Sequence, residues 1–128
     1  MIVLDTHVWL WMTAAPNRLS RDAHAAIGRS DRLGVCTISC WELAMLVAAG
    51  RIRVEQDINV WVRQALAADR VEAVPLIAGA AVAAAQLPVG FPGDPADRII
   101  YATAVGLGVP LISRDARISS FDPHRVVW

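Results

Sequence analysis

Four short segments of this chain each place a carboxylate where an apolar strand is expected to end or a helix to begin. These acids are Asp5, Glu42, Asp97 and Asp115, and Asp94 lies three residues before Asp97. In an open parallel sheet, ligands bind outside the carboxyl ends of the strands, so acids from separate segments can converge there. Converging carboxylates repel one another unless a cation binds between them, and Mg²⁺ and Mn²⁺ prefer oxygen ligands. The pattern predicts a divalent metal site and metal-assisted phosphodiester chemistry.

Short runs rich in Val and Ile alternate along the chain with segments whose apolar residues recur every three or four positions. The runs predict buried strands, and the recurring segments predict helices. We expect strands at residues 2–4, 34–38, 71–76, 109–112 and 125–127, and helices at residues 6–12, 20–28, 39–49, 57–67, 77–86 and 95–107. This alternation favours the α/β class, with a three-layer α/β/α architecture around five mainly parallel strands. The acids then share one edge of the sheet if the first strand lies between the second and the fourth.

Each acid also has a structural explanation when it is taken alone. Asp5 and Asp94 can be helix N-caps, and Ser39 followed three residues later by Glu42 has the form of a capping box. Asp97 would lie in a first helical turn, where the helix dipole favours a negative charge by about 0.3 to 1 kcal/mol. Asp115 follows a strand in a polar turn. These separate explanations do not account for all the acids gathering at one edge of one sheet, which a metal site would.

The length and composition are those of a soluble globular protein. We expect residues 1–128 to form a single domain, which is long enough to bury a core without disulfides. No apolar run is long enough to span a membrane, and no signal-like leader precedes the first strand. Cys36 and Cys40 have neither a metal-binding nor a redox spacing, so we expect reduced thiols. We therefore expect a cytoplasmic protein with no membrane association.

The basic residues constrain both the surface and the chemistry. All 12 are Arg, against 12 acidic residues, and setting the five candidate site acids aside leaves a charge of +5 on the rest of the chain. Such a surface can attract a polyanion. A phosphoryl-transfer domain of the receiver or haloacid-dehalogenase type also uses an Asp after its first strand, but it needs a Lys that this chain lacks. No Gly-rich phosphate loop ending in Lys is present either.

Together, the acidic segments resemble the PIN-domain ribonucleases, and specifically the VapC-type toxins of type II toxin-antitoxin systems. The similarity lies in four ordered segments, namely Ile2 to Trp11, Ser39 to Ala44, Asp94 to Ala104 and Ser113 to Ile118. The resemblance implies a parallel sheet in the order 3-2-1-4-5 and cleavage of RNA that depends on Mg²⁺ or Mn²⁺. It also implies a homodimer and a cognate antitoxin that blocks the acidic pocket.

The resemblance also implies roles for individual residues. Asp5, Glu42, Asp97 and Asp115 would be the catalytic, metal-binding acids, and Asp94 would be an auxiliary acid. Thr6 and Ser113 would be supporting hydroxyls. Arg98 would contact phosphate or orient a carboxylate, or else form a surface ion pair. His7 could donate a hydrogen bond to substrate, but a ring packed beside the first helix is the simpler expectation.

The chain departs from the family pattern at two places. Members often carry Lys on the helix after the Trp-Glu pair, where this chain has Leu46. They often carry His or Arg before the Asp-Pro pair, where it has Phe91, Pro92 and Gly93. Substrate contacts therefore do not transfer from the family. The five Trp residues have helical spacing or flank the candidate site, and we expect burial in the core or an interface rather than stacking on bases.

The chemistry implied is in-line hydrolysis of single-stranded or loop RNA, leaving a 5′-phosphate and a 3′-hydroxyl. A metal-free route through the 2′-hydroxyl needs a pair of His residues, whereas His7, His24 and His124 are scattered along the chain. The alternative is a non-catalytic PIN-like interaction module in which the acids serve only as helix caps. Uptake of Mn²⁺ by the purified protein separates the two.

Overall fold

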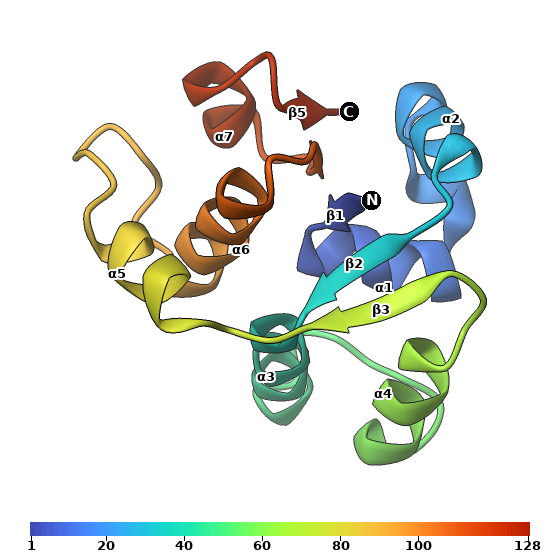
Figure 1. The fold of residues 1–128 in the computed structure, drawn as a ribbon. Coiled ribbons are helices and arrows are strands. Elements are labelled where there is room, and N and C mark those ends of the chain that lie inside the picture. Colours follow the sequence, from blue (N-terminus) through green and yellow to red (C-terminus); the bar gives the residue numbers. More distant parts are fainter.

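All strand pairings in the central sheet are parallel, and the strand order is β3-β2-β1-β4-β5. The computed structural model describes residues 1–128 (Figure 1). The strands are β1 (Ile2–Leu4), β2 (Leu33–Cys36), β3 (Val71–Val74), β4 (Leu111–Ile112) and β5 (Val126–Val127). The predicted parallel sheet and its order are confirmed. With β1 between β2 and β4, the three strands end at the same edge.

Seven α-helices and one 3₁₀ helix surround the sheet. They are α1 (Thr6–Ala14), η1 (Pro16–Arg18), α2 (Arg21–Arg29), α3 (Thr37–Ala48), α4 (Ile58–Leu66), α5 (Ala78–Ala85), α6 (Pro95–Leu107) and α7 (Ala116–Phe121). None of these helices has the length and apolar character needed to cross a membrane.

Two apolar clusters, one on each face of the sheet, form the core. Alternate residues of β1 point to opposite faces, so Ile2 and Leu4 belong to one cluster and Val3 to the other. The first cluster contains buried residues of α1 to α4, and the second contains residues of α6 and α7, with α5 packed outside α6 (Figure 1). The expected three-layer α/β/α architecture is confirmed, and both layers bring helix starts to the edge where the acids lie.

The start of α3 differs from the sequence-based expectation. The second strand ends at Cys36 rather than at residue 38, and the helix begins at Thr37, with Cys36 as an N-cap that makes no side-chain bond. Ser39 is therefore inside the helix, and the predicted capping box with Glu42 is wrong. The β-branched Thr37 and Ile38 favoured the longer strand, but they are the first two residues of α3.

Two short elements were missed, namely η1 and α7. Each is shorter than two helical turns, so the spacing of apolar residues gives almost no signal. Helix α7 buries Ile118, and the Asp115 carboxylate caps its start by accepting a hydrogen bond from the Arg117 N–H at 2.8 Å. This helix fixes where Asp115 lies.

Helix α6 ends at Leu107, and Gly108 is its C-cap. Gly108 has a positive φ of 67°, in the left-handed region that L-residues adopt only with strain. Gly106 lies inside the helix, and a Cβ added at either glycine would meet nothing within 4 Å. Any effect of Ala at these sites is therefore a backbone effect.

We predict that Gly108→Ala lowers the free energy of unfolding by about 1 kcal/mol, because Ala is strained at positive φ. The matched control is Gly106→Ala, which should raise this free energy by up to about 1 kcal/mol because Ala favours a helix interior. Urea denaturation measures both. Equal losses at the two positions would contradict the assigned end of α6.

Candidate metal centre

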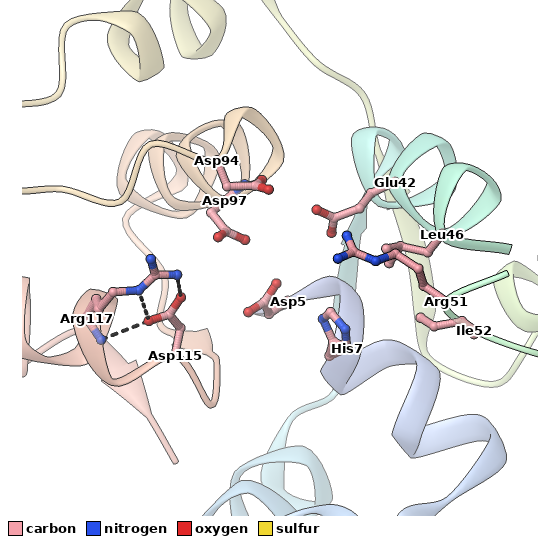
Figure 2. A pocket seen from close by; sticks show the side chains of 10 residues that line it. All are labelled: Asp5, His7, Glu42, Leu46, Arg51, Ile52, Asp94, Asp97, Asp115 and Arg117. Atoms are coloured by element: carbon pink, nitrogen blue, oxygen red, sulfur yellow. Dashed lines mark hydrogen bonds and ion pairs between the residues drawn. The ribbon is translucent and has the colours of Figure 1, made fainter. Parts of the chain in front are cut away.

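A pocket of about 430 Å³ opens at the carboxyl edge of the sheet, and all five candidate acids line it. Its wall consists of Asp5, His7, Glu42, Leu46, Arg51, Ile52, Asp94, Asp97, Asp115 and Arg117 (Figure 2). The acids come from the end of β1, from α3, from the start of α6 and from the turn after β4. Segments far apart in the chain therefore place their carboxylates in one pocket.

Asp5 lies at the bottom of this pocket and is only 8% exposed. One carboxylate oxygen, Oδ1, accepts a hydrogen bond from the Thr6 N–H at 2.7 Å, which makes Asp5 the N-cap of α1. The other, Oδ2, accepts a hydrogen bond from the Ser113 hydroxyl at 2.6 Å. Because Ser113 follows β4, its bond joins the ends of neighbouring strands, and the two bonds together fix the carboxylate in one orientation. Asp5 is both a cap and a pocket residue.

Glu42, Asp94 and Asp97 form the tightest group of acids. One ligand atom from each lies within 4.8 Å of the other two. Asp94 caps α6 by accepting a hydrogen bond from the Asp97 N–H at 3.1 Å, and Asp97 lies in the first turn of that helix. Glu42 lies in the second turn of α3 and points toward the acids of α6 (Figure 2). Because there is no capping box, Glu42 has no role at the start of α3. Its place in this group of acids is therefore the better explanation for a Glu at this position.

The acids raise one another's pKa values. Burial raises the pKa of Asp97 to about 8, and the negative charges of Asp5, Asp94 and Glu42 add to the rise. Burial also raises the pKa values of Asp5 and of Glu42 above their ordinary ranges. Asp97 therefore keeps its proton at neutral pH while no cation is bound. A carboxyl group in this position favours a ligand that carries positive charge.

Asp115 differs from the other acids because it has a cationic partner. Its two carboxylate oxygens accept hydrogen bonds from Arg117, at 2.7 Å from Nη2 and 3.1 Å from Nε (Figure 2). This pairing lowers the pKa of Asp115. The residue stays ionised, and its side chain is turned toward Arg117 on one wall of the pocket.

Thr6 supports the site from beneath. Its hydroxyl donates to the Ser39 hydroxyl at 2.9 Å, and both residues are fully buried. This bond joins α1 to α3, the helices that follow Asp5 and carry Glu42. Ser39, taken from the sequence as a cap, instead helps to set the distance between these two helices.

Arg98 does not lie in the acidic pocket. Its guanidinium donates to the backbone carbonyls of Pro92 at 3.1 Å, Ala84 at 2.9 Å and Leu87 at 3.5 Å. The predicted orientation of a carboxylate and the alternative surface ion pair are therefore wrong, because Arg98 pairs with no acid, while its contact with phosphate stays a prediction. The three carbonyls belong to the segment before α6, and Arg98 is the residue that holds this segment in place.

Sequence reasoning missed two cationic residues of the pocket, Arg51 and Arg117. Arg51 follows Gly50, whose φ of 70° turns the chain back after α3, and the sequence around it carries no sign of an active site. Arg117 had a usable signal, since it lies two residues after Asp115. His7 was expected to pack beside α1. It is exposed at the pocket, with its ring centroid 5.7 Å from that of Trp11.

Three of the five Trp residues are buried as expected, and Trp128 is half-buried against the core. Trp9, Trp11 and Trp61 are buried, and the rings of Trp9 and Trp61 pack edge to face at 5.1 Å between centroids. Trp41 on α3 is 52% exposed, so burial within the chain does not explain it.

The pocket residues fit a divalent cation. Carboxylate groups from the end of β1, from α3 and from the starts of α6 and α7 line one pocket. Three of these acids, Asp5, Asp94 and Asp115, have hydrogen-bond partners, whereas no Arg pairs with the group formed by Glu42, Asp94 and Asp97. An oxygen-only ligand set of this kind suits Mg²⁺ or Mn²⁺.

Comparison with known proteins agrees with this architecture. The model of the PIN domain family matches residues 2–122. The chain belongs to the PIN-domain family. A PIN-domain relative, Ribonuclease VapC22 from Mycobacterium tuberculosis, is 43% identical over 129 aligned residues, covering 99% of this chain and 98% of that protein.

Two solved structures share the PIN fold over almost their whole length. A toxin-antitoxin complex from Klebsiella pneumoniae matches with a TM-score of 0.69 and 18% identity, covering 100% of this chain and 97% of that one. VapBC2 from Rickettsia felis, bound to a DNA fragment from its promoter, matches with a TM-score of 0.67 and 14% identity, covering 98% and 97%. At these identities the likeness concerns the fold.

We predict that the metal-free protein loses stability as the pH rises from about 5 to about 8. The pKa of Asp97 is raised from 3.8 in the unfolded chain to about 8 in the folded one, so the folded state binds the extra proton in this range. The stabilising effect of this proton is complete below the pKa that Asp97 has in the unfolded chain. It is lost as the pH rises through the pKa that Asp97 has in the folded protein. The Tm in chelator should fall accordingly, and Asp97→Asn should remove most of the fall.

Mn²⁺ should raise the Tm more at about pH 8 than at about pH 5, because protons compete with the cation for the same oxygens. The matched control is Asp69→Asn, since the Asp69 side chain is 96% exposed and outside the pocket. A Tm in chelator that does not change with pH, together with no Mn²⁺ uptake by isothermal titration, would contradict the metal centre. That result would favour the non-catalytic module.

Proposed function

We propose that this chain is a Mg²⁺- or Mn²⁺-dependent endoribonuclease and the toxin of a type II toxin-antitoxin pair, with residues 1–128 acting as one nuclease unit. The observation that carries the proposal is the acidic pocket of a PIN domain in a chain 43% identical to a protein named as a ribonuclease. The proposed substrate is single-stranded or loop RNA, whose backbone can enter an open pocket at the edge of the sheet.

Asp5, Glu42 and Asp97 would hold the cation, with Asp94 beside them. When bound, a divalent cation lowers the pKa of a water molecule and stabilises negative charge on the phosphate. Asp97 would have to give up its proton to hold a cation, because burial and the negative charges of Asp5, Asp94 and Glu42 raise its pKa to about 8. The Ser113 hydroxyl and the Thr6 N–H hold Asp5 still, so this carboxylate does not have to reorient.

Asp115 and Arg117 would act together at one wall of the pocket. Arg117 keeps Asp115 ionised, and the pair presents an exposed guanidinium at the pocket mouth, with 68% of the Arg117 side chain accessible. A phosphate entering the pocket can accept hydrogen bonds from this guanidinium in place of Asp115. The Asp115 oxygens can then turn toward the other acids. We assign Asp115 to the catalytic acids on this basis.

The histidines support the metal-dependent route. Activation of the 2′-hydroxyl by two His residues needs both rings at the reacting phosphate. Only His7 lines the acidic pocket. His24 is hydrogen-bonded to the Pro16 carbonyl at 2.8 Å, and His124 lines a different pocket.

We propose that the antitoxin binds along α3 and reaches the acidic pocket from there. A groove of about 360 Å³ lies between α3 and α4, and five of its seven lining residues are apolar. Trp41 and Met45, both more than half exposed, lie on α3, and the next residue, Leu46, lines the acidic pocket. An apolar helix on this surface would place its end at the metal centre.

We propose that two copies of the chain associate through α5 and α6. A groove of about 600 Å³ with nine apolar residues among its 13 lies between these helices. Ile77, Val105 and Leu107 line it and are all more than 40% exposed, and Val82 on α5 is 56% exposed. Exposed apolar side chains gathered in this way are typical of an interface.

The function is tested with Asp97→Asn and Asp5→Ala. Each should reduce cleavage of single-stranded RNA in Mn²⁺ to below about 1% of the wild-type rate, because each removes a ligand and the transition-state charge stabilisation it supports. Far-ultraviolet circular dichroism checks the fold, and Asp69→Asn is the matched surface control. In cells, wild-type expression should arrest growth and Asp97→Asn should not. Wild-type cleavage rates in either pocket variant would refute the site.

The homodimer is tested by light scattering. The wild-type protein should have twice the mass of one chain, and Val82→Asp combined with Val105→Asp should have the mass of one, because buried carboxylates would oppose association. Val89→Asp is the control, since Val89 is fully exposed and lines neither groove. A wild-type mass of one chain rules out the dimer.

A further inference from the structure

Two guanidinium groups from distant parts of the chain lie on one Trp ring. The central guanidinium carbon, Cζ, is 4.6 Å from the Trp11 ring centroid for Arg18 and 5.7 Å for Arg114. Arg18 ends η1, and Arg114 lies in the turn between β4 and α7. The indole of Trp11 is buried, with 6% exposure, whereas both Arg residues are exposed. We call Trp11 with these two residues the Trp11 patch.

The Trp11 patch has no anionic partner within the chain. Four other Arg residues pair with a carboxylate, but neither Arg18 nor Arg114 forms an ion pair or a side-chain hydrogen bond. Stacking uses the flat face of a guanidinium and leaves its N–H donors, which point outward in the plane, available. Two like charges held on one ring, with their donors unused, favour an anionic ligand such as a phosphate.

The patch adjoins the acidic pocket. His7 lines that pocket, and its ring lies 5.7 Å from the Trp11 ring. Arg114 directly precedes Asp115, another pocket residue. A strand whose cleaved phosphate lies in the pocket therefore has its neighbouring phosphates close to Arg18 and Arg114.

The charge of the pocket makes such a contact necessary. Five carboxyl groups line it against two guanidinium groups, so its own side chains repel an RNA backbone. In the metal-free protein, affinity for the strand therefore depends on cations outside the pocket, since phosphate contacts supply most of the affinity for RNA of unspecified sequence. The Trp11 patch is a pair of unpartnered cations in the required place.

We infer that Arg18 and Arg114, held on the Trp11 ring, bind backbone phosphates of the RNA strand next to the bond that is cleaved. The inference rests on the proposed nuclease function and names residues that position its substrate. Because the indole is covered by the two side chains, the patch contacts phosphates and does not stack on bases. An acidic segment of a protein partner has similar chemistry, but the position beside the pocket favours the substrate strand.

The test compares Arg18→Gln combined with Arg114→Gln against a control with the same loss of charge, Arg29→Gln combined with Arg63→Gln. Arg29 and Arg63 are exposed, form no ion pair and line no part of the acidic pocket. Binding of a fluorescein-labelled single-stranded oligouridine of about 12 nucleotides is measured by anisotropy in EDTA, where no cleavage occurs. Cleavage of the same strand is then measured in Mn²⁺.

The patch variant should bind the strand at least about tenfold more weakly, and the slope of log affinity against log salt should fall by about 1.4, the value for two phosphates of a single strand. In Mn²⁺ the loss should appear mainly in KM. The control should have the wild-type slope of log affinity against log salt, to within about half of the change expected for one phosphate contact. Wild-type slope and KM in the patch variant would overturn the inference, and would leave an acidic protein segment as the ligand.

The result also separates this inference from the proposed function. If the wild-type protein binds the strand, the patch variant does not, and neither cleaves it in Mn²⁺, the phosphate contact stands and the nuclease activity fails. If the wild-type protein does not bind the strand at any salt concentration, the inference is overturned.

Discussion

Mutual repulsion among the pocket carboxylates is the constraint on which the rest of the structure depends. Burial, together with the negative charges of neighbouring acids, raises the pKa values of Asp5, Glu42 and Asp97, and the packing beneath keeps these groups together. Two apolar clusters, one on each face of the sheet, provide that packing. In the absence of a cation the repulsion is reduced by a proton held on Asp97. The fold therefore brings the pocket acids together, and a proton or a cation offsets their negative charge.

The acids stay in position because most of them also serve the backbone. Asp5, Asp94 and Asp115 are the N-caps of α1, α6 and α7, and each uses one oxygen for a backbone N–H. A carboxylate has a second oxygen with free lone pairs, so a cap can also line a pocket. The structural explanation of these three acids as helix caps is therefore confirmed, and it is compatible with the proposed role of the same residues at a metal site.

The sequence predicted those parts of the site that depend on local patterns. The strand-end position of Asp5 and the Asp94-Pro95 helix start were enough to place two acids, and the family resemblance ordered the strands. Contacts made by long side chains were not predictable in this way. Arg98 stands one residue after Asp97 yet turns back to the carbonyls before α6, and Arg51 enters the pocket only because Gly50 reverses the chain. The boundary of α3 failed because β-branched residues at its start favoured a strand.

The bonds from Arg98 to the carbonyls of Ala84, Leu87 and Pro92 have a consequence for how this protein can diverge. They anchor the connection between α5 and α6 at both of its ends, immediately before the residue that caps α6. Between the anchors, the connection runs through Val89 and Gly90, which are exposed and do not line the acidic pocket. Changes of length or composition in this span can therefore accumulate without moving the pocket acids, which leaves the surface beside the acidic pocket open to variation.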